Sequence, residues 1–477
     1  MITFDNTYVQ LPSEFFARVD PDKAPAPKLI KLNTALANEL GLDAEWLASP
    51  DGIAVLSGAA VAIGSEPLAM AYAGHQFGGW SPQLGDGRAH LLGEIVAPDG
   101  IRRDIQLKGS GATPFSRNGD GKAALGPVLR EYIVSEFMAA AGVPTTRALA
   151  AVSTGERVQR ETGMPGAVLT RIAQSHVRVG TFQYFFARKQ SENLQILADY
   201  VIDRHYPEAR NSENPTLTML SAVMERQAKL IAKWMCLGFI HGVMNTDNVQ
   251  IAGETIDYGP CAFMDGFHPN TVFSSIDQNG RYAWVNQPNI GVWNISRLAE
   301  ALLPILHGDE DTAVKLAEGA VEGFSDIFND ALNAGIAAKL GINVDSAFMQ
   351  TTFKVMTDHS CDFTLFFAEL TRIAAGGSDD AFVDLFVSQD AAHRWLEAWR
   401  VVFDPALLGG MTAANPVFIP RNHRVEEVIS SAIAGDFMSF EKLISVLETP
   451  FVEQPENSEY ERPPTADQVV HQTFCGT

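Results

Sequence analysis

The feature that most constrains the fold is a long helix-periodic segment that runs into a short polar loop. Apolar residues recur at helical spacing through residues 217–240, LTMLSAVMERQAKLIAKWMCLGFI, and predict one long helix that delivers the chain directly to His241. The chain continues as HGVMNTDNVQIAGETIDYGP, residues 241–260, in which Asn248 and Asp257 stand nine positions apart. A short hairpin between these two residues would return Asp257 to the side of Asn248. The loop after this helix is therefore expected to place two oxygen-bearing side chains, those of Asn248 and Asp257, beside each other.

Asn248 and Asp257 are candidate ligands for a divalent metal ion. Mg²⁺ prefers one or two side-chain oxygens together with phosphate oxygens and water. Asn and Asp are also common turn residues, so either one alone indicates little. Their occurrence with His241 and with the triplet Asp257-Tyr258-Gly259, all after a long helix, favours a metal site.

Upstream, two β-like runs precede a glycine-rich stretch and a helix. The runs 88–96 and 101–108 flank the turn sequence APDG, and Lys108 ends the second run on its polar face. A lysine that grips phosphates from a strand end is commonly held by a glutamate of the following helix. We expect Lys108 to pair with Glu131, and Glu136, on another face of the same helix, is the competing partner.

The order of the predicted elements indicates an α+β fold. Two further β-like runs, 147–153 and 166–172, follow the helix expected near 123–142, and the chain after about residue 180 is mostly helical. We expect a small β-rich N-terminal lobe and a large helical C-terminal lobe. The predicted boundaries are an N-terminal extension 1–75, the first lobe 76–178, the helical lobe with the catalytic loop and metal site 179–448, and an extended tail 449–477.

Two glycine-rich stretches have the composition of nucleotide loops. SRNGDGKA, residues 116–123, is close to a Walker A loop, but Ser116 replaces the first glycine and Ala123 replaces the Mg²⁺-binding Ser or Thr. QLGDGRAH, residues 83–90, places a glycine pair at the start of a strand, where backbone N–H groups approach phosphate closely. A plain tight turn is the alternative interpretation of both.

Composition excludes several functional classes. The 477 residues include 57 acidic and 35 basic ones, a net charge of −22, whereas broad nucleic-acid or anionic-membrane binding needs a basic surface. No apolar run has the roughly eighteen residues of a transmembrane helix, and the first residues show no secretory signal. The four cysteines form no C-x-x-C pair. We therefore expect a cytoplasmic protein with no nucleic-acid and no membrane partner.

The order of hairpin, Lys108, helix with Glu131, long helix, polar loop and Asp-x-Gly triplet resembles a protein-kinase-like fold, except that Val243 stands where a kinase has its catalytic aspartate. A more specific resemblance, over almost the whole chain, is to the selenoprotein O family. It is carried by QLGDGRAHLLGE, DIQLKGSGATPFSR, GDGKAAL, LREYIVSE, HGVMNTDN, IDYGPCAFMD and QPNIGVWNISRLA. Members of this family are bilobal pseudokinases that act as protein adenylyltransferases.

The resemblance implies an activity and a set of site residues. ATP would lie in a flipped orientation, so that AMP passes to Ser, Thr or Tyr hydroxyls of proteins, redox-related ones among them, while pyrophosphate leaves. Asp247 would accept the proton, Glu131 would orient Lys108, and Mg²⁺ (or Mn²⁺) would bind Asn248 and Asp257. The implied nucleotide contacts are Gly85, Gly87, Arg88, Lys108, Asp120, Gly121, Arg171, Arg178 and Asp257.

Other activities stay open at this point. A phosphotransferase that uses the γ-phosphate is disfavoured by Val243 and by the extra arginines, whereas a uridylyltransferase that uses UTP and Mn²⁺ and a catalytically silent ATP-binding scaffold are both compatible with the residues. Cys261, four residues after Asp257, and Cys475, third from the end, are predicted to form a regulatory disulfide; two unrelated thiols are the equally weighted alternative. A cysteine near the C-terminus looks like the bacterial form of the family.

Overall fold

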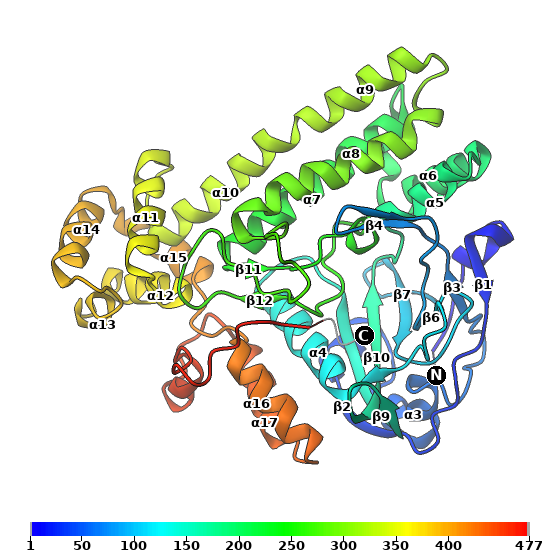
Figure 1. The fold of residues 1–477 in the computed structure, drawn as a ribbon, viewed down its shortest axis with the longest axis horizontal. Coiled ribbons are helices and arrows are strands. Elements are labelled where there is room, and N and C mark those ends of the chain that lie inside the picture. Colours follow the sequence, from blue (N-terminus) through cyan, green and yellow to red (C-terminus); the bar gives the residue numbers. More distant parts are fainter. Residues whose placement is uncertain (1, 475–477) are drawn as a thin grey trace.

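The first half of the chain builds one antiparallel sheet. The computed structural model describes residues 2–474, and Figure 1 shows the sheet at one end of the molecule with a long helical part extending away from it. The strand order is β1-β3-β6-β7-β10-β9-β2, with β8 also paired to β10. The strands are β1 Phe16–Arg18, β2 Lys28–Leu32, β3 Leu68–Met70, β6 Ala89–Val96, β7 Arg102–Lys108, β8 Ala123–Ala124, β9 Arg147–Gln159 and β10 Gly163–Ala173.

The hairpin β6–β7 positions Lys108. Its register pairs Ala89 with Lys108 and Val96 with Arg102, as the APDG turn predicts. Ile105 and Leu107 are fully buried on one face of β7. The opposite face, with Asp104 and Gln106, is also buried because it faces the helical part of the molecule instead of water. Lys108 is therefore held at a covered interface.

Helix α4, Leu125–Ala140, crosses the sheet and carries Glu131 inward. It ends just before Gly142, whose φ of +72° takes the chain out of the helix. Two C-terminal helices, α16 Asn422–Ile433 and α17 Met438–Leu447, cover its other side. Arg130 of α4 pairs with Glu426 of α16, and the Tyr132 ring lies 5.6 Å from that of Phe440 on α17. Helix α4 is thus packed between the sheet on one side and helices α16 and α17 on the other.

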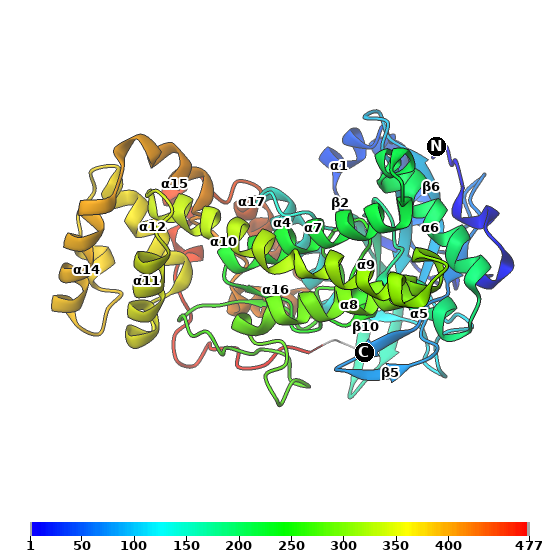
Figure 2. The ribbon, with the colours of Figure 1, turned by 90° about the horizontal axis from the view of Figure 1, so that it is seen from above.

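The second part of the molecule is helical, which together with the sheet confirms the predicted α+β class and its lobes (Figure 2). Its helices are α5 Val179–Ala187, α6 Ser191–His205, α7 Pro215–Cys236, α8 Gln287–Leu306, α9 Glu310–Glu322, α10 Phe324–Leu340, α11 Ser346–His359, α12 Phe363–Ala374, α13 Asp380–Val383, α14 Gln389–Val402 and α15 Leu408–Ala414. Figure 2 shows α11, α12 and α14 gathered at the end far from the sheet.

The long helix is shorter than its periodicity predicts. Helix α7 begins after the Asn214 cap and ends at Cys236, not at residue 240. Gly238 adopts a φ of +67°, and Phe239–Ile240 then form strand β11, which pairs with β12, Ala262–Phe263. The expectation of a helix running directly into His241 is wrong, because apolar periodicity does not distinguish the last helical turn from a buried two-residue strand.

Both ends of the chain pack onto this framework. Residues before Gly74 supply strands β1, β2 and β3 and the short helices α1 Thr34–Glu39, α2 Ala44–Ala48 and α3 Pro50–Leu56. The tail after α17 returns along the helical part, where Arg372 binds Glu453 and Glu461. Farther on, Thr473 is buried and donates to the carbonyl of Pro260 at 2.6 Å.

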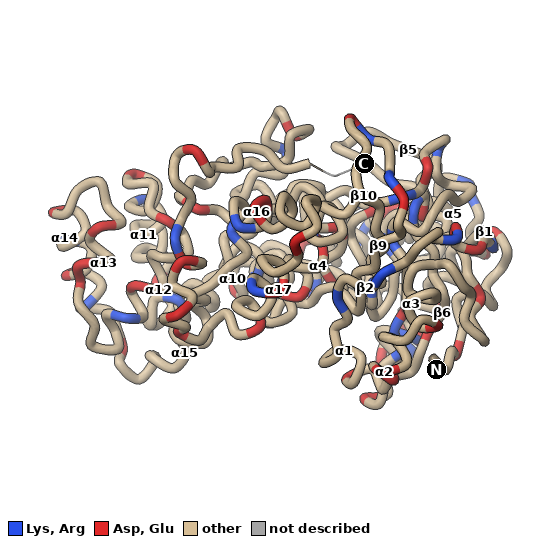
Figure 3. The backbone as a smooth tube through the Cα atoms, turned by 90° about the horizontal axis from the view of Figure 1, so that it is seen from below, with Lys and Arg blue, Asp and Glu red and all other residues tan. Residues whose placement is uncertain are grey.

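Two further features of the structure concern membrane-spanning helices and the distribution of charge. Among residues 2–474, none of the helices combines the length and the apolar character that a membrane crossing requires. Figure 3 shows acidic and basic residues dispersed among the others throughout the described part of the chain. The net charge of −22 is therefore spread over the chain instead of forming one acidic arm.

Candidate active site

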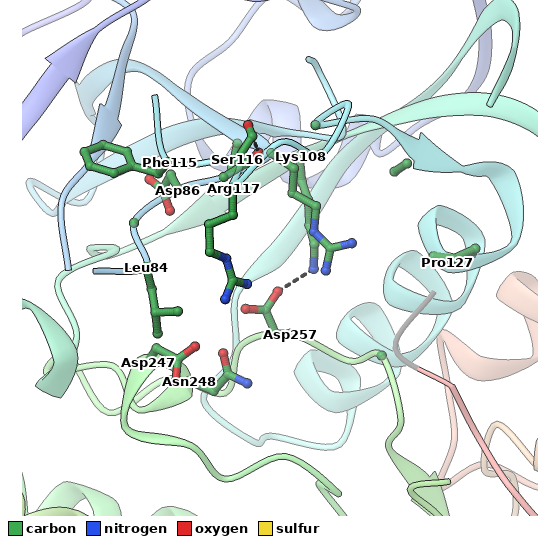
Figure 4. Close-up of a pocket in the computed structure, with 18 of the residues that line it drawn as sticks. Leu84, Asp86, Lys108, Phe115, Ser116, Arg117, Pro127, Asp247, Asn248 and Asp257 are labelled. Atoms are coloured by element: carbon green, nitrogen blue, oxygen red, sulfur yellow. Dashed lines mark hydrogen bonds and ion pairs between the residues drawn. The ribbon is translucent and has the colours of Figure 1, made fainter. Parts of the chain in front are cut away.

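A pocket of about 810 Å³ lies where the sheet, the glycine-rich loop, helix α4 and the polar loop after α7 meet (Figure 4). All the site residues predicted from the sequence line it: Gly85, Gly87, Arg88, Lys108, Asp120, Gly121, Glu131, Arg171, Arg178, Asp247, Asn248 and Asp257. They come from segments more than 150 positions apart in the sequence, so their meeting is a property of the fold. Their chemical roles stay predictions.

Lys108 and Arg171 form a cationic pair bridged by two carboxylates. Lys108 Nζ lies 2.5 Å from Glu131 Oε2 and also binds Asp257 Oδ1. Arg171 Nη1 contacts Glu131 Oε1 at 3.1 Å and Asp257 Oδ1 at 2.9 Å. The competing partner Glu136 binds Arg147 instead, at 2.8 Å. The predicted choice of Glu131 over Glu136 as the partner of Lys108 is confirmed.

Arg178 links the polar loop to the glycine pair. Its Nη1 donates to the backbone carbonyl of Asp247 at 2.8 Å, and its Nη2 lies 3.4 Å from Asp86 Oδ1. The guanidinium also lies over the Tyr72 ring, 4.5 Å from its centre. Burial alone would lower the pKa of Arg178, but the surrounding tyrosine and carboxylates keep it raised, so a fixed positive charge faces the pocket.

Asp257 is an anchored carboxylate. Burial by itself would raise its pKa, but Lys108, Arg171 and Arg178 outweigh that effect and hold the pKa well below its usual range. The residue adopts a φ of +65°, a left-handed conformation unusual for a residue other than glycine, which aims its carboxylate into the pocket. Asp257 is therefore ionised under all ordinary conditions.

Asn248 and Asp257 fit a divalent metal ion. Asn248 donates its Nδ2 to the carbonyl of Val243 at 3.0 Å, which fixes the amide and leaves Oδ1 as the free acceptor. Figure 4 shows Asn248 and Asp257 projecting into the same part of the pocket. Within residues 2–474 no cluster of three or more His, Cys, Asp or Glu side chains suits a metal. An ion here would need phosphate oxygens to complete its shell, as Mg²⁺ in nucleotide sites does.

Asp247 has a different environment from Asp257. Burial raises the pKa of its carboxyl to about 6, although a hydrogen bond from Gln76 and the charge of Arg178 act in the opposite direction. Gln76 Nε2 donates to Oδ2 at 3.0 Å. Oδ1 is buried and has no hydrogen-bond partner among residues 2–474. A carboxyl with a pKa near neutrality and a free oxygen is suited to accept a proton.

His241 and Val243 explain the framework of the loop. His241 is buried, its Nε2 lies 2.9 Å from the carbonyl of Ile256, and burial lowers its pKa to about 4. The neutral imidazole thus ties the start of the loop to the residue before Asp257. Val243 lines the pocket and supplies the carbonyl that holds Asn248, so it takes part in shaping the site without offering a base.

The glycines and Asp120 have packing explanations in addition to any role toward phosphate. A Cβ on Gly85 would lie 2.3 Å from the Phe115 ring, and one on Gly121 would lie 2.0 Å from the Gly111 carbonyl oxygen. Gly87 likewise has no room for a side chain, because the carbonyl of Phe115 would lie 2.8 Å away. The carboxylate of Asp120 is engaged by Arg160 at 2.9 Å. These residues hold the glycine-rich loop against the sheet edge.

Some pocket residues were not predicted from the sequence. Among them are Tyr72, Gln76, Asp86 and Arg117. Asp86 stands between the two glycines of QLGDGRAH, a predicted phosphate loop, and only the structure shows that it is buried. Arg117 and the predicted Arg88 pair with no carboxylate among residues 2–474, although the chain is acidic. Two such free guanidinium groups at one pocket favour an anionic ligand.

In the part of the chain that the structure describes, Cys261 and Cys361 are buried free thiols and Cys236 is a half-buried free thiol. Burial raises the pKa of Cys261 to about 12. Cys475 lies outside the described residues, so the predicted Cys261–Cys475 disulfide stays a prediction. Thr473 bonds to Pro260, which brings the described end of the tail next to Cys261.

Comparison with known proteins gives one consistent result. A family model described as "Protein adenylyltransferase SelO" matches residues 1–448. Proteins named "Protein nucleotidyltransferase YdiU" are similar over their full length. That of Bradyrhizobium sp. (strain BTAi1) is 56% identical over 485 positions, 99% of each chain. That of Rhodopseudomonas palustris (strain BisB18) is 54% identical over 99% of each chain, and that of Rhizobium rhizogenes (strain K84) is 55% identical over 100% of this chain and 97% of its own.

Proposed function

The chain belongs to the SelO family, and from this premise we propose that it transfers AMP from ATP to Ser, Thr or Tyr hydroxyls of proteins. The observation that carries the proposal is a contrast between two carboxyl groups of one pocket, which arginines also line. The pKa of Asp257 is held well below its usual range, whereas that of Asp247 is raised to about 6. Metal and nucleotide binding need the first, and proton transfer needs the second.

In the proposed reaction the acceptor hydroxyl oxygen attacks the α-phosphorus of ATP. The hydroxyl proton passes to Asp247, the new oxygen–phosphorus bond forms, and the bond between the α-phosphorus and the bridging oxygen of pyrophosphate breaks. Phosphoryl-type transfer depends mainly on positioning and charge neutralisation, so Asp247 supports the step and does not dominate it.

The arginines of the pocket are suited to bind pyrophosphate, the leaving group of the proposed reaction. Pyrophosphate carries several negative charges and has to be held inside the site until transfer is complete. Arg88 and Arg117 have no carboxylate partner within residues 2–474, and Arg178 is fixed by Asp86 and Tyr72. Guanidinium binds phosphate oxygens bidentately and stays charged at every working pH. This set supports the flipped orientation of ATP.

Asn248 and Asp257 would hold Mg²⁺ (or Mn²⁺), and the ion, when bound, would neutralise phosphate charge. Lys108 and Arg171 already neutralise Asp257 in the structure. Binding of the ion and the nucleotide is therefore expected to draw Lys108 away from Asp257 and toward phosphate, while Glu131 keeps hold of its Nζ. Glu131 would act as the orienting partner of Lys108.

Isotope position in ATP tests the proposal. The purified protein is incubated with a mixture of candidate acceptor proteins and with ATP labelled at either the α- or the γ-phosphate. Transfer from the α-position alone is expected, and the label should remain with the acceptor in denaturing gels. Label from the γ-position alone would show a phosphotransferase, and label from neither would favour a silent scaffold.

A second candidate, uridylyl transfer from UTP with Mn²⁺, is compatible with this pocket, because the contacts proposed above are to phosphate and metal, which ATP and UTP share. Competition between α-labelled ATP with Mg²⁺ and α-labelled UTP with Mn²⁺ separates the two. Faster transfer from UTP would replace adenylylation by uridylylation and leave the roles of Asp247, Asn248 and Asp257 unchanged.

We further propose that Cys261 and Cys475 form a regulatory disulfide across the loop after Asp257. The support is the contact of Thr473 with Pro260, which adjoins Cys261. Because burial raises the pKa of the Cys261 thiol to about 12, oxidation requires local opening of this loop. Peptide mapping without reductant, before and after oxidation, should find the Cys261–Cys475 crosslink; its absence after oxidation would remove the idea.

A further inference from the structure

The hairpin formed by β4, Gly74–Gln76, and β5, Gly79–Ser81, contacts the polar loop residue by residue. The backbone N–H of His75 donates to Thr246 Oγ1 at 2.7 Å, and that of Phe77 donates to Asn245 Oδ1 at 3.0 Å. Between them, Gln76 Nε2 donates to Asp247 Oδ2 at 3.0 Å. Residues 75–77 thus bind residues 245–247, a stretch about 170 positions away in the chain.

The hairpin also makes room for the second oxygen of Asp247. A Cβ on Gly74 would lie 2.8 Å from Asp247 Oδ1 and 3.1 Å from its Cβ. Only glycine therefore lets the carboxyl occupy this position. Oδ1 has no hydrogen-bond partner within residues 2–474, and the whole residue is 7% exposed at the wall of the pocket. One oxygen is held and the other is left free.

Several contacts and a two-residue turn hold the hairpin in a fixed position. Phe77 and Gly78 both have positive φ values, +52° and +85°, a turn geometry that matches strand twist but is strained for phenylalanine. The Phe77 ring packs 5.2 Å from that of Tyr282, whose hydroxyl donates to Asn245 at 2.6 Å. His75 is held by Gln183 at 3.0 Å. Strained backbone kept by several contacts is typical of residues that position a functional group.

We propose that Gln76 is a positioning residue for the transfer reaction: its amide holds Asp247 Oδ2 so that Oδ1 faces the acceptor hydroxyl. This inference rests on the proposed function, in which Oδ1 takes the hydroxyl proton as the hydroxyl oxygen bonds to the α-phosphorus and pyrophosphate leaves. Gln76 touches Asp247 and none of the other predicted catalytic residues through the hydrogen bonds found, so its effect passes through that carboxylate.

The loss of Gln76 should appear in the rate of transfer and not in nucleotide binding. Its Nε2 donates to Asp247 Oδ2, and Oδ1 has no partner among residues 2–474, so without the amide the carboxyl is free to rotate about its Cβ–Cγ bond. A rotated carboxyl no longer presents Oδ1 to the acceptor hydroxyl, and misplacement of a reacting group by about 1 Å costs about a hundredfold in rate.

The experiment measures single-turnover AMP transfer from α-labelled ATP and separates the rate at saturating ATP from the affinity for ATP. In Gln76→Leu the rate should fall about tenfold or more, because the proton acceptor is no longer oriented. In the Asp247→Asn background the same Gln76→Leu change should alter the rate by less than about twofold, since the group on which Gln76 acts is already lost. ATP affinity should stay within about twofold of wild type, since Gln76 acts on the proton acceptor.

Gln183→Leu is the matched control. It removes a glutamine that binds the same hairpin through His75 and has no hydrogen bond to Asp247 among residues 2–474. Its rate of transfer should stay within about twofold of wild type even if the hairpin loses stability. A wild-type rate in Gln76→Leu, or an equal loss in Gln183→Leu, would overturn the positioning role.

Failure of the proposed function gives a different pattern. Absence of α-label transfer by the wild-type protein, or an unchanged rate in Asp247→Asn, would contradict adenylylation or the role of Asp247 before any Gln76 variant is made. The Gln76→Leu change in the Asp247→Asn background then tests Gln76 alone. A loss as large as that in the wild-type background would overturn the positioning role.

Discussion

Asp247 and Asp257 are two carboxylates of one pocket, ten positions apart, in opposite electrostatic environments. Asp257 is bound by Lys108 and Arg171, and these charges hold its pKa well below the usual range in spite of burial. Asp247 receives one neutral hydrogen bond from Gln76, and burial raises its pKa to about 6. Neighbouring titratable groups whose environments drive their pKa values apart commonly divide the chemistry between them. This difference supports the proposed roles, charge binding for Asp257 and proton acceptance for Asp247.

Removal of the Asp257 charge should have the largest effect. Asp257→Asn keeps the shape but loses the carboxylate that is proposed to bind the metal ion and, through it, the nucleotide. We expect α-label transfer to fall about a thousandfold, the order found when a main electrostatic contributor is removed. Excess Mg²⁺ or Mn²⁺ should restore little. A rate within tenfold of wild type would contradict the assignment.

Asp247→Asn should have a smaller effect on the same assay. Its loss removes a general base, a contribution of about a hundredfold in comparable cases. Nucleotide affinity should change little, so the loss should fall on kcat and leave KM nearly as it is. If Asp247→Asn proves more damaging than Asp257→Asn, the division of roles is wrong.

The pH profile sharpens the comparison without a substitution. Asp247 accepts a proton only when ionised, so with a pKa of about 6 the rate should fall about tenfold for each pH unit below 6. Asp257 stays ionised throughout this range because its pKa is depressed. Single-turnover rates from pH 4.5 to 8 measure the limb, and the residual rate of Asp247→Asn should show no limb at that pH.

The smallest expected effect is on stability, and its sign differs between the two residues. The folded pKa of Asp247 is raised from 3.8 to about 6, so its ionisation costs folding free energy above that pH, and the cost disappears below about pH 4. The free energy of unfolding of Asp247→Asn should therefore exceed that of wild type by about 1–3 kcal/mol at pH 8, with no such gain at pH 4. Asp257→Asn should be destabilised, because Lys108 and Arg171 lose their partner. Denaturant unfolding curves of both variants measure this; equal signs would contradict the contrast.

Local patterns predicted much of the fold from the sequence. The APDG turn between two β-like runs predicted the β6–β7 hairpin, and apolar periodicity predicted helix α4 with Glu131 facing Lys108. These elements depend on neighbours in the chain, which a sequence shows. The end of α7 was misplaced because a buried strand and a buried helical turn have the same apolar composition.

From the residues alone, the sequence predicted only those site residues whose side-chain type and spacing indicate a chemical role. Lys108, Asn248 and Asp257 have spacings compatible with phosphate and metal binding, and the resemblance to a family added the arginines and Asp247 as candidates. Gln76 was missed because glutamine has no characteristic reaction, and its partner lies 171 positions away. The free guanidinium of Arg117 was missed for a similar reason, since no local pattern tells which arginines lack a carboxylate.

The sequence by itself determined the fold class, the family, the glycine-rich loop and the pair of candidate oxygen ligands that follows the long helix. These depend on periodicity, spacing and side-chain type. The tertiary structure decided which of two similar carboxylates is anchored and which is left near neutrality, because a pKa depends on burial and on charges that meet only after folding. The hairpin of residues 74–81 shows this most clearly, since its contact with residues 245–247 exists only once the lobes have packed together.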